Sequence, residues 1–155
     1  MKYYIKQKGF SIGDRFDIKN EYGYDCFYVQ GEVFSFGKKL HMYYSNGVEA
    51  AFIKRRVFTF LPKYEVYVNG RLAMEIIKEF TMFRQCYSIR ALGWQVTGDF
   101  FAHEYVINRA EQSVAHISKQ WFTWGDSYQI NILSGVFDIY VLAVVLTIDI
   151  TMSQN

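Results

Sequence analysis

The stretch DIYVLAVVLTID, from Asp138 to Asp149, constrains the fold most strongly, because ten uncharged residues lie between two carboxylates. As a helix these residues would cover only about 15 Å, half of a bilayer's hydrocarbon core of about 30 Å. Extending the run to about 18 residues would bring in Asp138 or Asp149, and either carboxylate would cost about 2.5–3.5 kcal/mol near the bilayer centre. We therefore predict a core element and no transmembrane segment.

The local structure of this stretch stays open from its residues alone. Six of the residues from 139 to 148 are β-branched, and this propensity favours a buried strand. The stretch is also apolar on every side, so it could form a helix only if protein surrounded that helix completely. Periodicity does not separate the two alternatives in so short an apolar run.

The rest of the chain is rich in strand signals. Among 155 residues there are 13 Tyr, 14 Phe and 3 Trp but only one Pro. Short runs of aromatic and β-branched residues, bounded by Gly, Asn, Asp or Ser, recur throughout. We predict about eleven strands near residues 2–7, 15–20, 25–30, 39–44, 48–53, 64–68, 71–77, 87–92, 104–109, 114–119 and 127–133. With no linker or low-complexity run, residues 1–155 are predicted to form a single all-β domain, and a closed barrel hides strand edges best.

Two Asn-Gly pairs predict tight hairpin turns. Asn46-Gly47 and Asn69-Gly70 each lie between two strand-like runs. Asn and Gly tolerate the positive φ angles of a type I′ turn, whose twist matches that of the flanking strands.

Signs of catalysis or metal binding are weak. His41, His103 and His116 occur singly in separate strand-like runs, and Cys26 and Cys86 lie 60 positions apart. Structural or surface histidines and two reduced, packed thiols account for these residues. We therefore expect no enzymatic activity, no metal and no cofactor. The N-terminal segment carries lysines and lacks the apolar core of a signal peptide, so a cytoplasmic location is expected.

Charge is distributed unevenly along the chain. Residues 1–63 carry a net charge of +5 and residues 64–155 a net charge of −3, for +2 in total. This total is far from the basic stripe of nucleic-acid-binding proteins, and the aromatic residues alternate with strand-buried positions along the chain, so no nucleic-acid partner is expected.

The densest basic cluster is IKRRVFTFLPK, which contains Lys54, Arg55, Arg56 and Lys63 and no acidic residue. In a strand Lys54 and Arg56 would share one face while Arg55 would point to the other. One side would then have to be buried and paired, or the strand would have to bulge; we predict a bulge near the strand end. The cluster is either a binding site for an anion or a solvated basic edge that discourages aggregation.

Several segments together resemble one protein family. These are YVQGEVFSFGKKL (28–40), FLPKYEVYVNG (60–70), VTGDFFAHEYVI (96–107), ISKQWFTWGDSYQINI (117–132) and VLAVVLTID (141–149). In this order, over nearly the whole chain, they resemble the LURP-one-related family, a part of the tubby C-terminal-like group that also includes phospholipid scramblases. The resemblance implies a β-barrel of roughly twelve strands that encloses one buried hydrophobic C-terminal helix.

The implied helix spans residues from about 136 to 150 and overrides the strand preference of this stretch. Asp138 and Asp149 would then lie near its two ends. Asp138 is expected to cap the first turn, where the helix dipole favours an anion. Asp149 lies at the unfavourable end and would need a cationic or N–H partner.

The resemblance also implies a function at the outer surface, because the helix would occupy the barrel interior. Tubby proteins bind phosphoinositide headgroups through basic residues on the barrel exterior, and scramblase-like members associate with membranes. We therefore expect surface binding of anionic phospholipid headgroups, with Lys54, Arg55, Arg56 and Lys63 chosen by charge density alone. The alternative is a protein–protein interaction module without a lipid or small-molecule ligand. Residues Trp121–Asp126, interpreted here as a tight aromatic turn, would then be the next surface to test.

Overall fold

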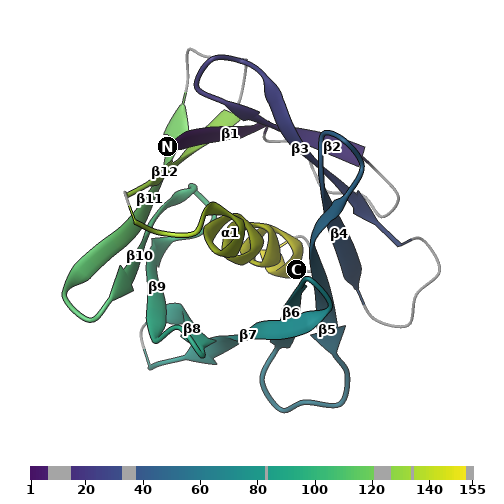
Figure 1. Cartoon of the computed structure of the whole chain (residues 1–155). Coiled ribbons are helices and arrows are strands. Elements are labelled where there is room, and N and C mark those ends of the chain that lie inside the picture. The colour runs from purple at the N-terminus through teal and green to yellow at the C-terminus, as the bar shows by residue number, and fades with distance from the viewer. Residues whose placement is uncertain (7–14, 33–37, 83, 121–126, 134, 153–155) are drawn as a thin grey trace.

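In the computed structural model of the chain, the described residues form a closed antiparallel barrel around one helix (Figure 1). The structure describes residues 1–6, 15–32, 38–82, 84–120, 127–133 and 135–152. Each strand pairs with the next one along the chain, and β1 closes the barrel against β12. The predicted all-β barrel with one enclosed C-terminal helix is thereby confirmed.

Within the described ranges the barrel contains twelve strands, one more than the residue patterns predicted. They are β1 Lys2–Lys6, β2 Arg15–Asn20, β3 Asp25–Gly31, β4 Lys39–Tyr44, β5 Glu49–Arg56, β6 Lys63–Val68, β7 Arg71–Phe80, β8 Gln85–Arg90, β9 Trp94–Asp99, β10 Glu104–Arg109, β11 Gln112–Gln120 and β12 Ser127–Ile132.

The additional strand is β9, whose pattern is weakened by Gly98. This glycine has a φ of 138°, and a Cβ placed there would lie 2.6 Å from the carbonyl oxygen of Glu104 on the paired strand β10. Only glycine allows this close approach, so a residue that interrupts the strand pattern in the sequence is required by the strand pairing.

Helix α1 (Asp138–Met152) fills the interior. Its buried residues are Ile139, Val141, Leu142, Ala143, Val144, Val145, Leu146, Thr147, Ile148, Ile150 and Thr151. The strands meet the helix with fully buried aliphatic side chains, among them Val29, Ile53, Val66, Val96 and Ile107. The strand preference of residues 139–148 is overridden, because β-branching costs a helix only a few tenths of a kcal/mol per residue while full burial of each side chain stabilises by about 1.5–3 kcal/mol.

Antiparallel order gives the barrel two distinct ends. At the Met1 end, the N-terminal ammonium donates to the carbonyl of Ile132 and α1 begins. At the other end, called here the Met152 end, α1 terminates beside the loops β5–β6, β7–β8 and β9–β10. Asp138 lies in the first helical turn, and its carboxylate accepts a hydrogen bond of 2.6 Å from the hydroxyl of Tyr3. A barrel tyrosine therefore binds the carboxylate that was expected to cap the helix.

The two Asn-Gly pairs form different turns. Asn69 and Gly70 have φ angles of 53° and 73°, as the predicted type I′ turn requires. In the other turn Gly47, with φ 88°, is the residue with positive φ, and its N–H donates to the carbonyl of Tyr44. The type I′ prediction is therefore wrong for Asn46-Gly47, where the Asn46 side chain accepts the N–H of Val48 and closes a longer loop.

Candidate anion-binding surface

The predicted basic residues lie where β5 ends and β6 begins, at the Met152 end of the barrel. Arg56 pairs with Lys63 and Arg55 with the buried Tyr64. Lys54, Arg56 and Lys63 therefore lie on the outer face, and Arg55 lies on the inner face with Tyr64. The structure thus brings three of the four candidate residues to one face and separates the fourth.

The strand pairing corrects the predicted bulge. The register between β5 and β6 is continuous through the basic residues. The shift in β5 occurs near its other end, where it faces Met42 and Tyr43 of β4. Arg55 is tolerated on the inner face because it lies at a barrel end, where a long side chain is only partly buried. The backbone N–H of Arg55 donates to the backbone carbonyl of Lys38 at 3.0 Å.

Two of the outward cations have carboxylate partners on neighbouring strands. Arg56 Nε lies 3.4 Å from Glu65 Oε1, and Lys63 Nζ lies 2.9 Å from Glu75 Oε2. The Lys63 side chain is only 18% exposed, whereas Arg56 is 49% exposed. In the part of the chain that the structure describes, no carboxylate lies within 4 Å of the exposed Lys54 ammonium. Lys54 and Arg56 therefore remain the cations most available to an external anion.

Sequence reasoning missed Lys39, which joins this surface through strand pairing. Lys39 on β4 is in register with Lys54 on β5, although the two residues are far apart in the sequence. Glu32 Oε2 lies 3.6 Å from Lys39 Nζ and partly balances its charge. The adjacent lysines in FGKKL were the available signal, but only the register shows which face they join.

His41 is held by two carboxylates on the outer face next to this surface. Its Nε2 lies 2.7 Å from Glu32 and its Nδ1 lies 2.8 Å from Glu49. Partial burial lowers the pKa of His41, but the hydrogen bonds to Glu32 and Glu49 outweigh it, so the pKa is raised. The ring stacks on Phe52 with centroids 4.7 Å apart. These contacts give His41 a structural role and agree with the interpretation of the histidines as structural.

Asp149 finds its partners at the Met152 end of the barrel interior. The hydroxyl of Tyr128 donates to the Asp149 carboxylate, and His103 Nε2 lies 3.6 Å from it. The rings of His103 and Tyr128 stack with centroids 4.3 Å apart. Burial, and then the Asp149 charge, raise the pKa of Tyr128 and of the neighbouring Tyr105. The predicted cationic or N–H partner is therefore chiefly a tyrosine hydroxyl, assisted by an imidazole.

An open groove of about 790 Å³ lies on the outer face of β9, β10 and β11. Two carboxylates line it, and both accept backbone hydrogen bonds. Asp99 accepts the N–H of Ala102 at 3.0 Å, and Glu104 accepts the N–H of Lys119 at 2.9 Å. Both acids therefore help to hold the chain in place, and the exposed imidazole of His116 lines the same groove.

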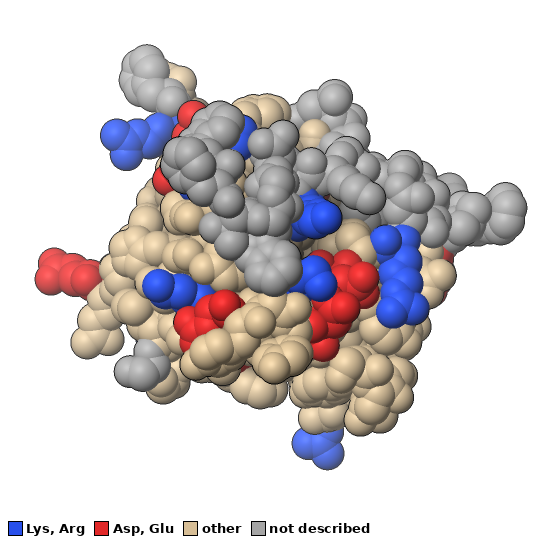
Figure 2. Space-filling view, turned by 90° about the horizontal axis from the view of Figure 1, so that it is seen from above, with Lys and Arg blue, Asp and Glu red and all other residues tan. Residues whose placement is uncertain are grey.

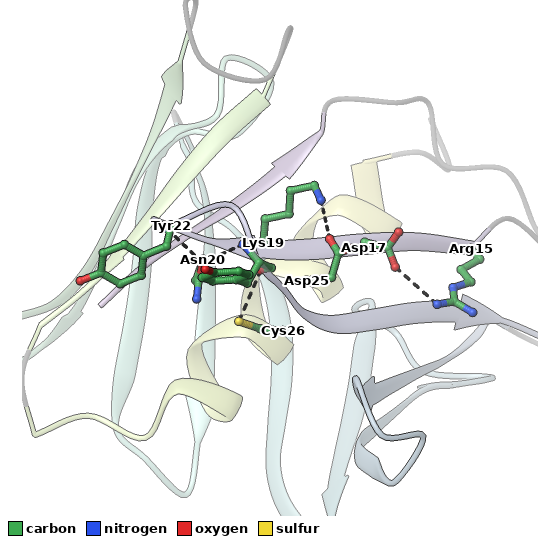
Figure 3. Close-up of polar contacts among 8 residues, drawn as sticks. Arg15, Asp17, Lys19, Asn20, Tyr22, Asp25 and Cys26 are labelled. Atoms are coloured by element: carbon green, nitrogen blue, oxygen red, sulfur yellow. Dashed lines mark hydrogen bonds and ion pairs between the residues drawn. The ribbon is translucent and has the colours of Figure 1, made fainter.

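Basic and acidic side chains lie against one another on the face shown in Figure 2. The β2–β3 hairpin shows the same mixing at close range (Figure 3), with ion pairs Arg15–Asp17 and Lys19–Asp25. In its turn, Asn20 accepts the N–H groups of Tyr22 and Tyr24, each at 3.0 Å. Cys26 donates to the Tyr24 carbonyl at 3.6 Å, and burial raises the pKa of its thiol, which disfavours the reactive thiolate form.

The remaining expectations concern metal ions, the aromatic turn and membranes. Within the described residues, no three His, Cys, Asp or Glu side chains gather in a way that could hold a metal ion. The predicted turn at Trp121–Asp126 lies outside the described residues. Among the residues that are described, no helix combines the length and the apolar character needed to cross a bilayer.

A twelve-stranded barrel filled by its own helix defines the class as tubby C-terminal-like. A family model described as LURP-one-related matches residues 1–149. The chain belongs to the LURP-one-related family.

Two known proteins are similar to this chain. Over 88 residues the chain is 30% identical to the uncharacterized protein YxjI of Bacillus subtilis, a match that covers 57% of this chain and 54% of that protein. The X-ray structure of an Arabidopsis thaliana protein has the same fold, with a TM-score of 0.65 at 15% identity over 97% of this chain and 90% of the other.

Proposed function

We propose that this barrel binds anionic phospholipid headgroups at its outer surface, through the basic residues at the Met152 end of β5. The observation that carries the proposal is the outward placement of Lys54 and Arg56 on one face, beside Lys39 of the paired strand. Arg guanidinium groups bind phosphate oxygens in bidentate fashion, and a Lys ammonium acts as a compact charge. The resemblance to the tubby C-terminal-like group points to the same chemistry.

The ion pairs rank the four candidate residues. Lys54 and Arg56 are the principal ligands, because their side chains are exposed. Lys63 is largely buried against Glu75, and Arg55 lies on the inner face, so both should contribute less. The proposal places the protein at a membrane surface on the cytoplasmic side, as expected from the sequence.

Vesicle pelleting tests the proposal. The variant K54A/R56A should weaken binding to phosphatidylserine-containing vesicles by roughly tenfold or more, because each cation near an anionic surface contributes about 1 kcal/mol. The matched control R71A/R109A removes two exposed cations at the Met1 end and should bind like the wild type. All three proteins should melt alike, because exposed charges contribute little to stability.

Ionic strength provides a second criterion. Raising the salt concentration from about 0.1 to 1 M shortens the Debye length from about 10 to 3 Å and should release the wild type. If the wild type ignores anionic vesicles at low salt, the lipid proposal fails. The protein–protein interaction alternative would then lead.

A further inference from the structure

The loop between β5 and β6 displays aromatic side chains to solvent. Phe58 and Phe60 are 94% and 101% exposed, and Val57 beside them is also exposed. Phe58 has a φ of 60°, a conformation that bulky residues rarely adopt. Two such exposed phenylalanines add no buried apolar surface to the core. The rare φ angle of Phe58 suggests that the loop conformation serves a function.

The neighbouring β7–β8 loop carries the same kind of side chain. Met82 in this loop is 89% exposed, and Phe80, the last residue of β7, is 58% exposed. Strands β5 to β8 are consecutive in the barrel, so the two loops lie side by side at the Met152 end. The N–H of Lys78 in β7 donates to the carbonyl of Pro62 at 2.9 Å and holds the end of the first loop against β7. The three most exposed large hydrophobic residues of the described chain thus share one barrel end.

Cations lie at the base of these loops and apolar groups at their tips. Arg56 and Lys63 are the strand residues that flank the first loop, and no acidic residue occurs from 54 to 63. Arg84 is exposed on the second loop, whereas Lys78 is buried and is not counted among these cations. A bilayer surface has the matching order, with acyl chains beneath a layer of anionic phosphate groups.

We propose that the Met152 end inserts Phe58, Phe60, Phe80 and Met82 into the interface of an anionic bilayer while the basic residues at the loop bases engage the headgroups. A bilayer fits better than a protein partner, because the apolar groups occupy two loop tips instead of one packed face and their cations are set back from the tips. This inference rests on the proposed headgroup binding and adds the depth and orientation of the bound protein.

Replacing the loop aromatics tests the insertion step. The variant F58S/F60S should bind vesicles of phosphatidylserine and phosphatidylcholine about tenfold or more weakly, because burying a single Phe side chain is enough to account for a change of that size. The matched control L72S/F137S alters two half-exposed apolar residues near the Met1 end and should bind like the wild type. F58S/F60S should melt like the wild type, since both replaced side chains are almost fully exposed.

A tryptophan probe measures depth directly and keeps an aromatic ring in the loop. With vesicles containing brominated phosphatidylcholine, F60W should show tryptophan quenching beyond that of the wild type, whereas F137W at the Met1 end should not. Absence of extra quenching in F60W overturns the insertion even if F58S/F60S binds weakly or folds poorly.

The outcomes separate this inference from the headgroup proposal. If K54A/R56A loses binding while F58S/F60S binds normally and F60W is not quenched, headgroup binding stands and insertion is wrong. If the wild type binds no anionic vesicle at low salt, both are wrong.

Discussion

Replacing Val144 by Asp should remove most of the stability of this protein. Val144 lies in the middle of α1 and has no exposed surface. At pH 7 the new carboxyl must be buried either charged, which costs several kcal/mol, or protonated. Protonation costs about 1.36 kcal/mol for each pH unit above an ordinary pKa of about 3.9, or roughly 4 kcal/mol at pH 7. Lost burial of the valine adds about 1–3 kcal/mol, against a typical total stability of about 5–15 kcal/mol.

Urea unfolding at about pH 7 and about pH 5 provides the assay, with V144T as the matched control. The hydroxyl of V144T can donate to the carbonyl of Tyr140, as Thr147 already donates to Ala143 at 2.8 Å. We therefore expect V144T to lose no more than about 1–2 kcal/mol. V144D should be poorly folded at pH 7, and its deficit should shrink by about 1.4 kcal/mol per pH unit on acidification. A V144D protein with the wild-type midpoint at both pH values would refute the buried helix.

Two further predictions concern titrating groups. Burial raises the pKa of Tyr105 and Tyr128, so the unfolded chain loses these protons at a lower pH than the folded protein. The free energy of unfolding should therefore fall above about pH 10 by about 1.4 kcal/mol per pH unit for each tyrosine. Denaturant unfolding measures this fall, and a stability that stays constant at alkaline pH would contradict it. The raised pKa of His41 stabilises the fold below about pH 6.5, and this contribution is lost as the pH rises through the folded-state pKa. An NMR titration should show a lower His41 pKa in E32Q than in the wild type. An unchanged value would show that the hydrogen bond from Glu32 does not raise the pKa of His41.

The sequence predicted most of the strands, because alternation of side chains follows directly from the pleat of a strand. In β6, Tyr64 and Val66 are buried between less buried neighbours, as the run YEVYV indicates. The same rule failed for β9, whose Gly98 is present for its close contact with β10. The side-chain pattern within one strand does not show how closely the backbone of the paired strand approaches it.

The candidate surface was only partly visible in the sequence. Charge density drew attention to Lys54 and Arg56, and the alternation of side chains along a strand correctly placed both on one face of β5. This alternation depends only on the strand itself. It could not identify Lys39, which reaches Lys54 through the register of β4 and β5, nor the carboxylate that holds Lys63. Ion pairing across strands depends on register, and register is set by the whole barrel.

By itself, the sequence determined that residues 138–149 lie in the core, because ten uncharged, mostly apolar residues between two carboxylates suit neither solvent nor a membrane span. Only the tertiary structure decided that they form a helix. Propensity distinguishes strand from helix by a few tenths of a kcal/mol per residue, and the run is apolar on every side in both cases. The closed barrel leaves an axial space that a helix fills, and burial of eleven of its residues, at about 1.5–3 kcal/mol for each large apolar side chain, outweighs the local preference.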